Sequence, residues 1–312
     1  MSDRIPMVFV ADVEGQLPET ISNSFQKYTR ITPLKAGGKG QLFTCKDTNL
    51  GRQVILKMLR PELYDDRVEL RRLIREAKIT AQLSHPATVP MYELGQDDQG
   101  HWYFSMKRIL GHTLFDIIVS LAKRESSAEK EFDLNRLLSI LTQVGDALAY
   151  AHASGVIHRD VKPENIIVGR FGEVTLIDWG SAKVWGMPNE VGDDTPEERT
   201  GTPLYMSPEQ VDGRRMVDER TDVYSLGVVM YEMMAQREPF RGANIRETFA
   251  NITSKEPMKP SEAAPHRFIP QELERICLKA MARNPSDRFQ SMRTMMDVIN
   301  EYRNNALLRG SL

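Results

Sequence analysis

The stretch from Val156 to Gly180 reads "VIHRDVKPENIIVGRFGEVTLIDWG" and sets polar residues beside two short apolar runs that are typical of strands. The polar residues of interest are Asp160, Lys162, Asn165 and Asp178. Carboxylates and a lysine next to buried apolar runs cost desolvation energy unless something pairs with them. A bound metal ion and a phosphate would supply such partners, so the stretch predicts a site for both.

Length and composition favour a large globular chain. With 312 residues, of which 41% are hydrophobic, the chain has enough apolar material for a large core and for two lobes or domains. The formal net charge is -2 and the pI is near 6.3. Because no overall basic character is present, nucleic acid and an anionic membrane surface are poor candidates for a partner. Small molecules or other proteins fit better.

The cysteines, the histidines and the lengths of the apolar stretches limit the possible classes of protein further. Only Cys45 and Cys277 occur, in no CxxC pattern, so we expect two buried free thiols and no disulfide framework. The scattered histidines lack the HxxxH spacing of a zinc hydrolase. The N-terminal apolar run is too short for a signal peptide, and the later apolar windows are too short to span a membrane. The default expectation is a cytoplasmic protein with no membrane segment.

The pattern of residues predicts strands first and helices later. Residues 28–60 read as three strands of an antiparallel meander, and residues 65–83 as a helix capped by Asp65 or Asp66. Two more strands are expected at 88–94 and 102–107, followed by a long helix from Leu134 that ends at Gly155. The rest of the chain is expected to be mostly helical. A long loop at 186–203, rich in Gly, Pro and acidic residues, is typical of a functional segment.

The order of the polar residues along the chain indicates phosphoryl transfer. Lys57 closes a strand, Glu76 lies on the next helix, and Asp160, Asn165 and Asp178 follow in the opening stretch. A transferring phosphoryl group needs its charge neutralised by a lysine and by Mg²⁺, and Mg²⁺ prefers oxygen ligands such as Asn and Asp. The acceptor hydroxyl needs a carboxylate to orient it.

With these motifs in order, the chain resembles the protein kinase family from about Thr29 to Tyr302, closest to the bacterial eukaryotic-like group. "HRDVKPEN" is similar to the catalytic loop of the family, "DWG" to its DFG motif, "VILK" to VAIK and "SPE" to APE. The resemblance implies an α+β two-lobed fold, with a small antiparallel N-lobe that carries one main helix and a larger helical C-lobe. The domain bounds that it implies are an N-terminal extension at 1–27, the N-lobe at 28–108, the C-lobe at 109–305 and a tail at 306–312.

The resemblance assigns a role to each polar residue of the series. It makes Asp160 the catalytic carboxylate, with Lys162 beside it, and makes Asn165 and Asp178 the ligands of Mg²⁺. Lys57 would contact the α- and β-phosphates of ATP while Glu76 holds it in place. Singly, such residues are more often solvated or structural, and it is their order along the chain that supports these roles.

The nucleotide site implied by the resemblance includes several apolar and glycine positions. These ATP-binding positions are Leu34, Gly37, Gly40, Leu42, Ile55, Lys57, Met106, Lys107, Ile109 and Ile167. Among them, Leu42 and Ile167 match residues that sandwich the adenine ring, Met106 matches the gatekeeper, and the Ile109 N–H would meet the adenine. Three departures stand out: Lys35 replaces the first glycine of the loop, Ile55 replaces a small alanine, and Lys107 replaces a common acidic residue.

The family pattern also implies which hydroxyl groups accept the phosphoryl group and how the activity is regulated. Lys162 and "GTP" at Gly201 to Pro203 are similar to the Ser/Thr branch, so proteins with Ser or Thr hydroxyls are the expected substrates. The loop offers Thr195 and Thr200 as hydroxyls that can be phosphorylated, and the phosphate would then pair with Arg159. We expect the chain to phosphorylate itself in this way, through transient self-association. Four residues before Thr202 stands Glu198, which we expect to pair with Arg159 without modification. Its alternative is a solvated acidic run. Glu209 and Arg288 match a structural ion pair.

Two other function classes remain to be weighed against an active kinase. A pseudokinase, serving as a nucleotide-binding scaffold, would account for Lys35 and Ile55, but such proteins usually lose the lysine or one of the aspartates, and this chain has all of them. An NAD-binding oxidoreductase predicts a glycine turn that enters a helix, followed by alternating strands and helices. The glycine turn here lies between two predicted strands, and the second half of the chain is helical, which argues against that class.

Overall fold

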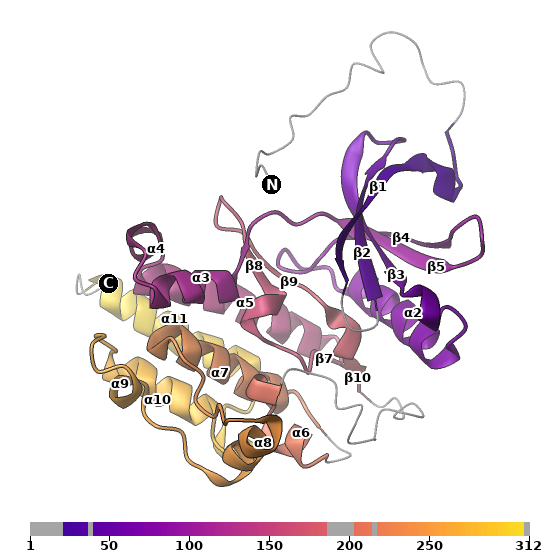
Figure 1. Cartoon of the computed structure of the whole chain (residues 1–312). Helices are drawn as coiled ribbons and strands as arrows, with labels where there is room; N and C mark the ends of the chain where they lie inside the picture. The colour runs from indigo at the N-terminus through magenta and orange to yellow at the C-terminus, as the bar shows by residue number, and fades with distance from the viewer. Residues whose placement is uncertain (1–20, 37–39, 186–202, 214–216, 309–312) are drawn as a thin grey trace. The chain divides into compact units, whose positions relative to one another are not determined.

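The computed structural model describes residues 21–36, 40–185, 203–213 and 217–308. The chain divides into two compact units (Figure 1). The sheet unit comprises Met1–Ser84 and Val89–Gly111, and the helical unit comprises His85–Thr88 and His112–Leu312. The domain bounds expected from the sequence stay predictions.

The sheet unit is built on a five-stranded antiparallel sheet with the strand order β1-β2-β3-β5-β4. Its strands are β1 (Tyr28–Ala36), β2 (Gly40–Asp47), β3 (Arg52–Leu59), β4 (Met91–Gln96) and β5 (Trp102–Lys107). The expected meander of three strands at 28–60 is therefore confirmed. The fourth strand begins at Met91, later than the expected Thr88. Pro90, which has no N–H to give to a ladder, precedes it, and Thr88 instead forms a bridge to Leu176 in the helical unit.

One helix, α2 (Arg67–Gln82), packs against β3, β4 and β5. Asp66 caps it by accepting hydrogen bonds from the N–H groups of Val68 and Glu69, which confirms one of the two expected caps. Its buried face includes Leu73 and Ala77, which meet Leu59 and Phe104 of the sheet. This packing fixes the helix against the face of the sheet that carries every second residue of β3.

The other face of the sheet carries a core of its own. Val54, Leu56 and Met58 of β3 pack there with Tyr28 and Tyr103. A short 3-10 helix, η1 (Phe25–Lys27), precedes β1, and the Phe25 ring makes edge contacts with both tyrosine rings. The residues directly before β1 thereby cover part of this face.

Within the described residues, the helical unit contains the remaining helices and five very short strands (Figure 1). Its α-helices in the described residues are α3 (Leu114–Ala122), α4 (Ser126–Glu131), α5 (Leu134–Ala153), α6 (Pro208–Val211), α7 (Arg220–Ala235), α8 (Ile245–Ser254), α9 (Pro260–Ala263), α10 (Gln271–Ala280) and α11 (Met292–Leu308). The strands are β6 (His112–Thr113), β7 (Val156–Ile157), β8 (Ile166–Val168), β9 (Val174–Leu176) and β10 (Lys183–Val184), of which β6, β8 and β9 form one antiparallel sheet and β7 pairs with β10.

Helix α7 is the centre of this unit, because every one of its residues after Arg220 is buried. It packs against α5, α9, α10 and α11. The long predicted helix is confirmed as α5, which ends one residue before a C-cap at Ser154, and Gly155 then adopts a φ of 76° that suits a glycine after a helix. Both expected thiols are free and buried.

The ion pair expected between Glu209 and Arg288 is present and buried. The two guanidinium nitrogens Nη1 and Nη2 each donate to one oxygen of Glu209 at 2.7 Å. Arg288 also donates to the carbonyl oxygens of Ala282, Arg283 and Arg220, so it ties α6 and the start of α7 to the segment before α11. Burial opposes ionisation of Glu209, but Arg288 keeps the pKa of this carboxyl below its ordinary value.

The fold class expected from the sequence is confirmed: an antiparallel sheet with one main helix, and a larger helical part. Within the described residues, no helix combines the length and the apolar character that crossing a bilayer requires.

Candidate active site

Lys57 and Glu76 form an ion pair inside the sheet unit. Alternation along β3 places Lys57 on the same face as Leu59, which packs on α2, and Glu76 lies next to Ala77 on the buried side of that helix. The Lys57 Nζ donates to both carboxylate oxygens of Glu76, at 2.6 and 2.8 Å. The pair predicted from "VILK" and the following helix is thus formed, and it fixes the position of the ammonium group.

The segment between β7 and β8 in the helical unit gathers three of the predicted residues. Lys162 Nζ donates to Asp160 Oδ2 at 2.6 Å. The amide nitrogen of Asn165 donates to the backbone oxygen of Asp160 at 2.9 Å and to its Oδ2 at 3.2 Å. Asp160 and Asn165 are buried. A carboxylate held by two side-chain donors has a defined orientation, as a group that positions a substrate hydroxyl requires.

The hairpin of β8 and β9 brings Asp178 to the same end of the small sheet as Asn165. Ile166 pairs with Leu176, and one step further along the ladder the N–H of Ile177 donates to the oxygen of Asn165 at 2.8 Å. Asp178 directly follows Ile177 and adopts a left-handed conformation with φ 65°. Although thirteen positions separate them in sequence, Asn165 and Asp178 therefore flank the same hairpin base.

Asp222 is a functional residue that sequence reasoning missed. It is fully buried at the start of α7 and accepts hydrogen bonds from the N–H groups of His158 and Arg159, at 2.8 and 2.9 Å, and from Nε2 of His152 at 2.8 Å. Arg159 has a φ of 66°, a strained value for a residue with a side chain. The carboxylate holds this strained backbone directly before Asp160. Burial opposes ionisation of Asp222, but the hydrogen bond from His152 and the neighbouring charges lower its pKa overall.

His158 and Trp179 also contact the segment that carries Asp160. His158 is fully buried, and burial lowers its pKa, so the neutral ring is favoured. Its Nδ1 accepts a hydrogen bond from the N–H of Asp160 at 3.2 Å, which leaves the proton on Nε2, near the oxygen of Ile177. The ring meets that of Trp179 edge on, with centroids 4.5 Å apart. His158 thus links the backbone of Asp160 to the residue before Asp178.

Most of the positions predicted to bind the nucleotide lie in the part of the chain that the structure describes. In the sheet unit Leu34 is exposed on β1, Gly40 begins β2, Leu42 is half-buried on β2, Ile55 is buried on β3, Met106 and Lys107 end β5, and Ile109 follows half-buried. Ile167 is half-buried on β8 of the helical unit. Gly37 lies outside the described residues. Their contacts with a nucleotide stay predictions.

The predicted activation-loop residues Thr195, Glu198, Thr200 and Thr202 also lie outside the described residues, so the proposed pairing of Glu198 with Arg159 stays a prediction. In the described part, the Arg159 side chain donates through Nε to the oxygen of Ser181 at 2.7 Å. Beyond the loop, Tyr205 donates to Glu232 of α7 at 2.6 Å, inside the core. Burial raises the pKa of Glu232 to about 7.

Comparison with known proteins decides the family. The model of the protein kinase domain matches residues 28–300, which is most of the chain. The chain belongs to the protein kinase family. Among curated proteins it is similar to the serine/threonine-protein kinases PknD of Chlamydia felis, 34% identical, and of Protochlamydia amoebophila, 33% identical. These matches cover 89% and 88% of this chain but only 31% and 30% of the relatives. The chain thus spans about a third of their length. The resemblance found in the sequence is confirmed.

Membership of the protein kinase family implies the use of ATP and a divalent metal ion, and the residues of the helical unit fit such an ion. The amide nitrogen of Asn165 faces Asp160, so its carbonyl oxygen is the atom available to a ligand. With Asp178 this gives oxygen donors, which Mg²⁺ prefers. No group of three or more acidic, histidine or cysteine side chains in the described parts of the chain forms a metal centre of its own. Such an ion takes its other ligands from phosphate and water.

Proposed function

We propose that this chain is an ATP-dependent protein kinase that transfers the γ-phosphoryl group to serine and threonine hydroxyls of proteins. The observation that carries the proposal is the arrangement of Asp160, held by Lys162 and Asn165, beside the hairpin base that leads to Asp178. Membership of the protein kinase family and similarity to relatives named serine/threonine-protein kinases support it.

In this proposal Asp160 orients the acceptor hydroxyl and accepts its proton as the oxygen attacks the γ-phosphorus. The bond from the γ-phosphorus to the oxygen that bridges it to the β-phosphate breaks, and ADP leaves. Lys162, which donates to the same carboxylate, neutralises charge that develops on the transferring group. Asn165 and Asp178 would hold Mg²⁺, which when bound offsets the negative charge of the phosphates. Lys57 contacts the α- and β-phosphates from a position that Glu76 sets.

The alternative, a nucleotide-binding scaffold without catalysis, is not favoured. Such a protein usually lacks the strand lysine or one of the two aspartates. Here Lys57 is paired and Asp160 is held by two donors. Ile55, which prompted this alternative, is a buried residue of β3. It adds bulk next to Lys57 without removing a reacting group.

A transfer assay tests the proposal. The purified chain is incubated with Mg²⁺ and ATP labelled in its γ-phosphate, and label is followed on the protein itself and on a generic basic protein. We expect Lys57→Met and Asp160→Asn each to lower the rate by orders of magnitude, because positioning and electrostatics supply nearly all catalysis in this reaction class.

Matched controls are Lys46→Met, at an exposed position of β2, and Asp297→Asn, at an exposed position of α11. Both should keep the wild-type rate. The assignment of the two residues is wrong if either catalytic variant turns over within a few-fold of wild type. If wild type transfers no label to any acceptor, the scaffold alternative replaces the kinase.

A further inference from the structure

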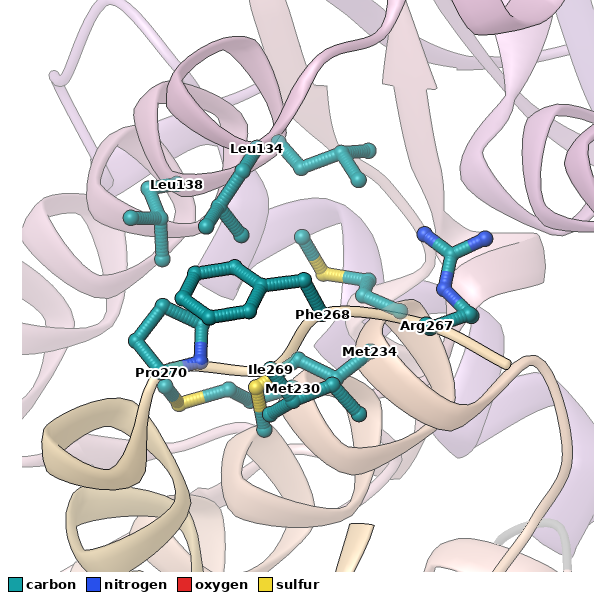
Figure 2. Close-up of a pocket in the computed structure, with 10 residues that line it drawn as sticks. Leu134, Leu138, Met230, Met234, Arg267, Phe268, Ile269 and Pro270 are labelled. Atoms are coloured by element: carbon teal, nitrogen blue, oxygen red, sulfur yellow. The ribbon is translucent and has the colours of Figure 1, made fainter. Parts of the chain in front are cut away.

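A second feature of the helical unit lies outside the catalytic residues: a small apolar pocket where α5, α7 and the loop before α10 meet (Figure 2). Leu134 and Leu138 of α5 form one side, Met230 and Met234 of α7 form another, and Pro270 closes the loop side. Its cavity volume is about 50 Å³. A cavity of about 150 Å³ holds a benzene molecule, so this one takes the end of a single aliphatic side chain.

Phe268 stands beside this pocket in an unusual state for a phenylalanine. It is 89% exposed, the largest exposed fraction among the large apolar side chains of the described residues. Single exposed apolar residues are common, but this ring lines an apolar pocket whose walls include methionines, which adapt their shape to what they contact. Together they offer apolar surface that a partner can cover.

A second, polar pocket adjoins the first. Its volume is about 340 Å³, and it is lined by Arg124, Glu129, His266, Arg267 and Phe268. Arg267 and Phe268 line both pockets, so the two are adjacent. Figure 2 shows the Arg267 side chain extending away from the Phe268 ring, toward the side opposite Pro270. An apolar recess and a cationic recess therefore lie one residue apart on the same loop.

The two arginines share their pocket with one acidic residue, Glu129, but form no ion pair with it. Within the described parts of the chain, neither Arg124 nor Arg267 has a carboxylate within ion-pair distance. Arg267 is half-buried. Burial lowers its pKa overall, the charge of Glu129 opposes this, and the like charge of Arg124 adds a smaller lowering effect. A half-buried guanidinium without a partner gains from an added anion, with which it forms charge-assisted hydrogen bonds.

We propose that this face of the helical unit binds a peptide segment of a protein partner in which an aliphatic side chain stands next to carboxylates. The aliphatic group enters the pocket beside Phe268, and the carboxylates contact Arg124 and Arg267. Aromatic residues and arginines are the side chains that most often carry binding energy in protein interfaces. A fatty acyl chain is the rival occupant, but the small volume of the apolar pocket favours one side chain over a chain of many methylenes.

A peptide titration without ATP tests the proposal independently of catalysis. The probe is a fluorescent capped peptide, Gly-Glu-Asp-Leu-Asp-Glu-Gly, followed by anisotropy on the full chain. We expect saturable binding that weakens with added salt, because the contacts with the arginines are screened. A peptide with Gln and Asn in place of the acids, and one with glycine in place of leucine, should each bind about tenfold more weakly.

Variants of the protein locate the contact. Phe268→Gln, Arg267→Gln and Arg124→Gln should each weaken binding of the acidic peptide about tenfold. All three side chains are exposed or half-buried, so the fold should be kept, which the melting temperature checks. Two neighbours on α8, Ile245→Gln and Arg246→Gln, serve as matched controls, since they also pair an exposed apolar residue with an exposed arginine.

Three outcomes overturn the proposal: no saturable binding by wild type, equal binding of the acidic and neutral peptides, or equal binding by wild type and the Arg267 and Phe268 variants. Sodium laurate is titrated in parallel. If laurate binds wild type and loses affinity in Phe268→Gln, while the peptide does not bind, the occupant is an acyl chain and the peptide proposal is wrong.

Discussion

A single carboxylate, that of Asp222, holds the backbone next to Asp160, the proposed catalytic aspartate. It accepts three hydrogen bonds inside the protein, two of them from consecutive backbone N–H groups at His158 and Arg159. Buried N–H groups without partners are costly, and a left-handed arginine adds strain. Asp222 offsets both costs at once, so the segment before Asp160 depends on it.

We expect Asp222→Asn to destabilise the protein and to slow transfer. One carboxylate oxygen becomes an NH₂ group that faces N–H donors, which leaves at least one buried donor unpaired at a cost of about 1 to 3 kcal/mol. Urea unfolding measures the loss of stability, and the transfer assay measures the rate. Asp297→Asn on the exposed face of α11 is the control. Unchanged stability and rate would mean that the three hydrogen bonds contribute little.

The residues to which we assign catalytic roles could be singled out in the sequence, whereas Asp222 could not. Lys57, Asp160 and Asp178 stand in short motifs whose order is informative. Asp222 stands in "TDVYSLG", where an aspartate before an apolar run reads as an ordinary helix start. The available signal was its place in the first turn of a helix whose following residues are nearly all apolar, where a buried acid needs a partner. Its partners are about 65 positions earlier in the chain and could not be identified without the fold.

At the scale of elements, α7 carries a buried acid whose protonation changes stability. Glu232 accepts a hydrogen bond from Tyr205, and burial raises its pKa to about 7, from 4.5. The charged groups that also act on it are Glu164, Glu238 and Arg241. Between these two pKa values the folded protein binds more protons than the unfolded chain. This contribution to stability is therefore present at low pH and is lost as the pH rises through 7.

We expect Glu232→Gln to remove this pH dependence. Glutamine resembles the protonated acid and can still accept the hydrogen bond of Tyr205. The difference in free energy of unfolding between wild type and variant should change by about 2 kcal/mol between pH 5 and pH 8, in favour of the variant at high pH. Urea unfolding at several pH values measures it. Parallel curves for the two proteins would show that Glu232 is ionised throughout.

The contact between α7 and α10 depends on a glycine. A Cβ added at Gly227 would lie 2.8 Å from Cβ of Ala280 and 3.0 Å from Cγ of Met281. We expect Gly227→Ala to cost about 1 to 3 kcal/mol through overpacking, partly offset by the better helix propensity of alanine. Thermal unfolding measures the change. Ala250→Ser, at an exposed position of α8, adds one atom without a clash and should be neutral. A more stable Gly227→Ala would show that the helices move apart easily.

Strong periodicity made α2, α5 and the first three strands predictable. The aspartate before α2 and the glycine after α5 marked the ends of these two helices. The start of β4 was misplaced because apolar residues at 88–94 suggest a strand while a proline at 90 ends the pairing. The loop with Arg267 and Phe268 was not singled out, since nothing in "HRFIP" tells an exposed ring from a buried one.

At the scale of the whole molecule, the residues with proposed catalytic roles come from two separate compact units. Lys57 and Glu76 belong to the sheet unit, and Asp160, Asn165 and Asp178 belong to the helical unit. When several residues act on the same reacting group, removing one of them already removes most of the rate enhancement that the others provide. We therefore expect the double variant Lys57→Met with Asp160→Asn to transfer phosphate about as slowly as the slower single variant.

The comparison uses initial rates of all four proteins under the same conditions, with unfolding curves as a check on the fold. Since the two residues belong to different units, their effects on stability should add. A double variant whose rate loss is the product of the single losses would contradict a shared reaction step and would point to two independent roles.

The hairpin of β8 and β9 has a consequence for how such a chain can vary. The two proposed metal ligands are joined at its base by the ladder and by the N–H of Ile177, while the turn between Val168 and Val174 extends away, with Phe171 81% exposed at its tip. Residues added or lost in that turn change the count between the ligands without moving either of them. The number of residues between the two motifs can therefore vary, because the three residue pairs of β8 and β9 keep the two proposed ligands at the same end of the hairpin.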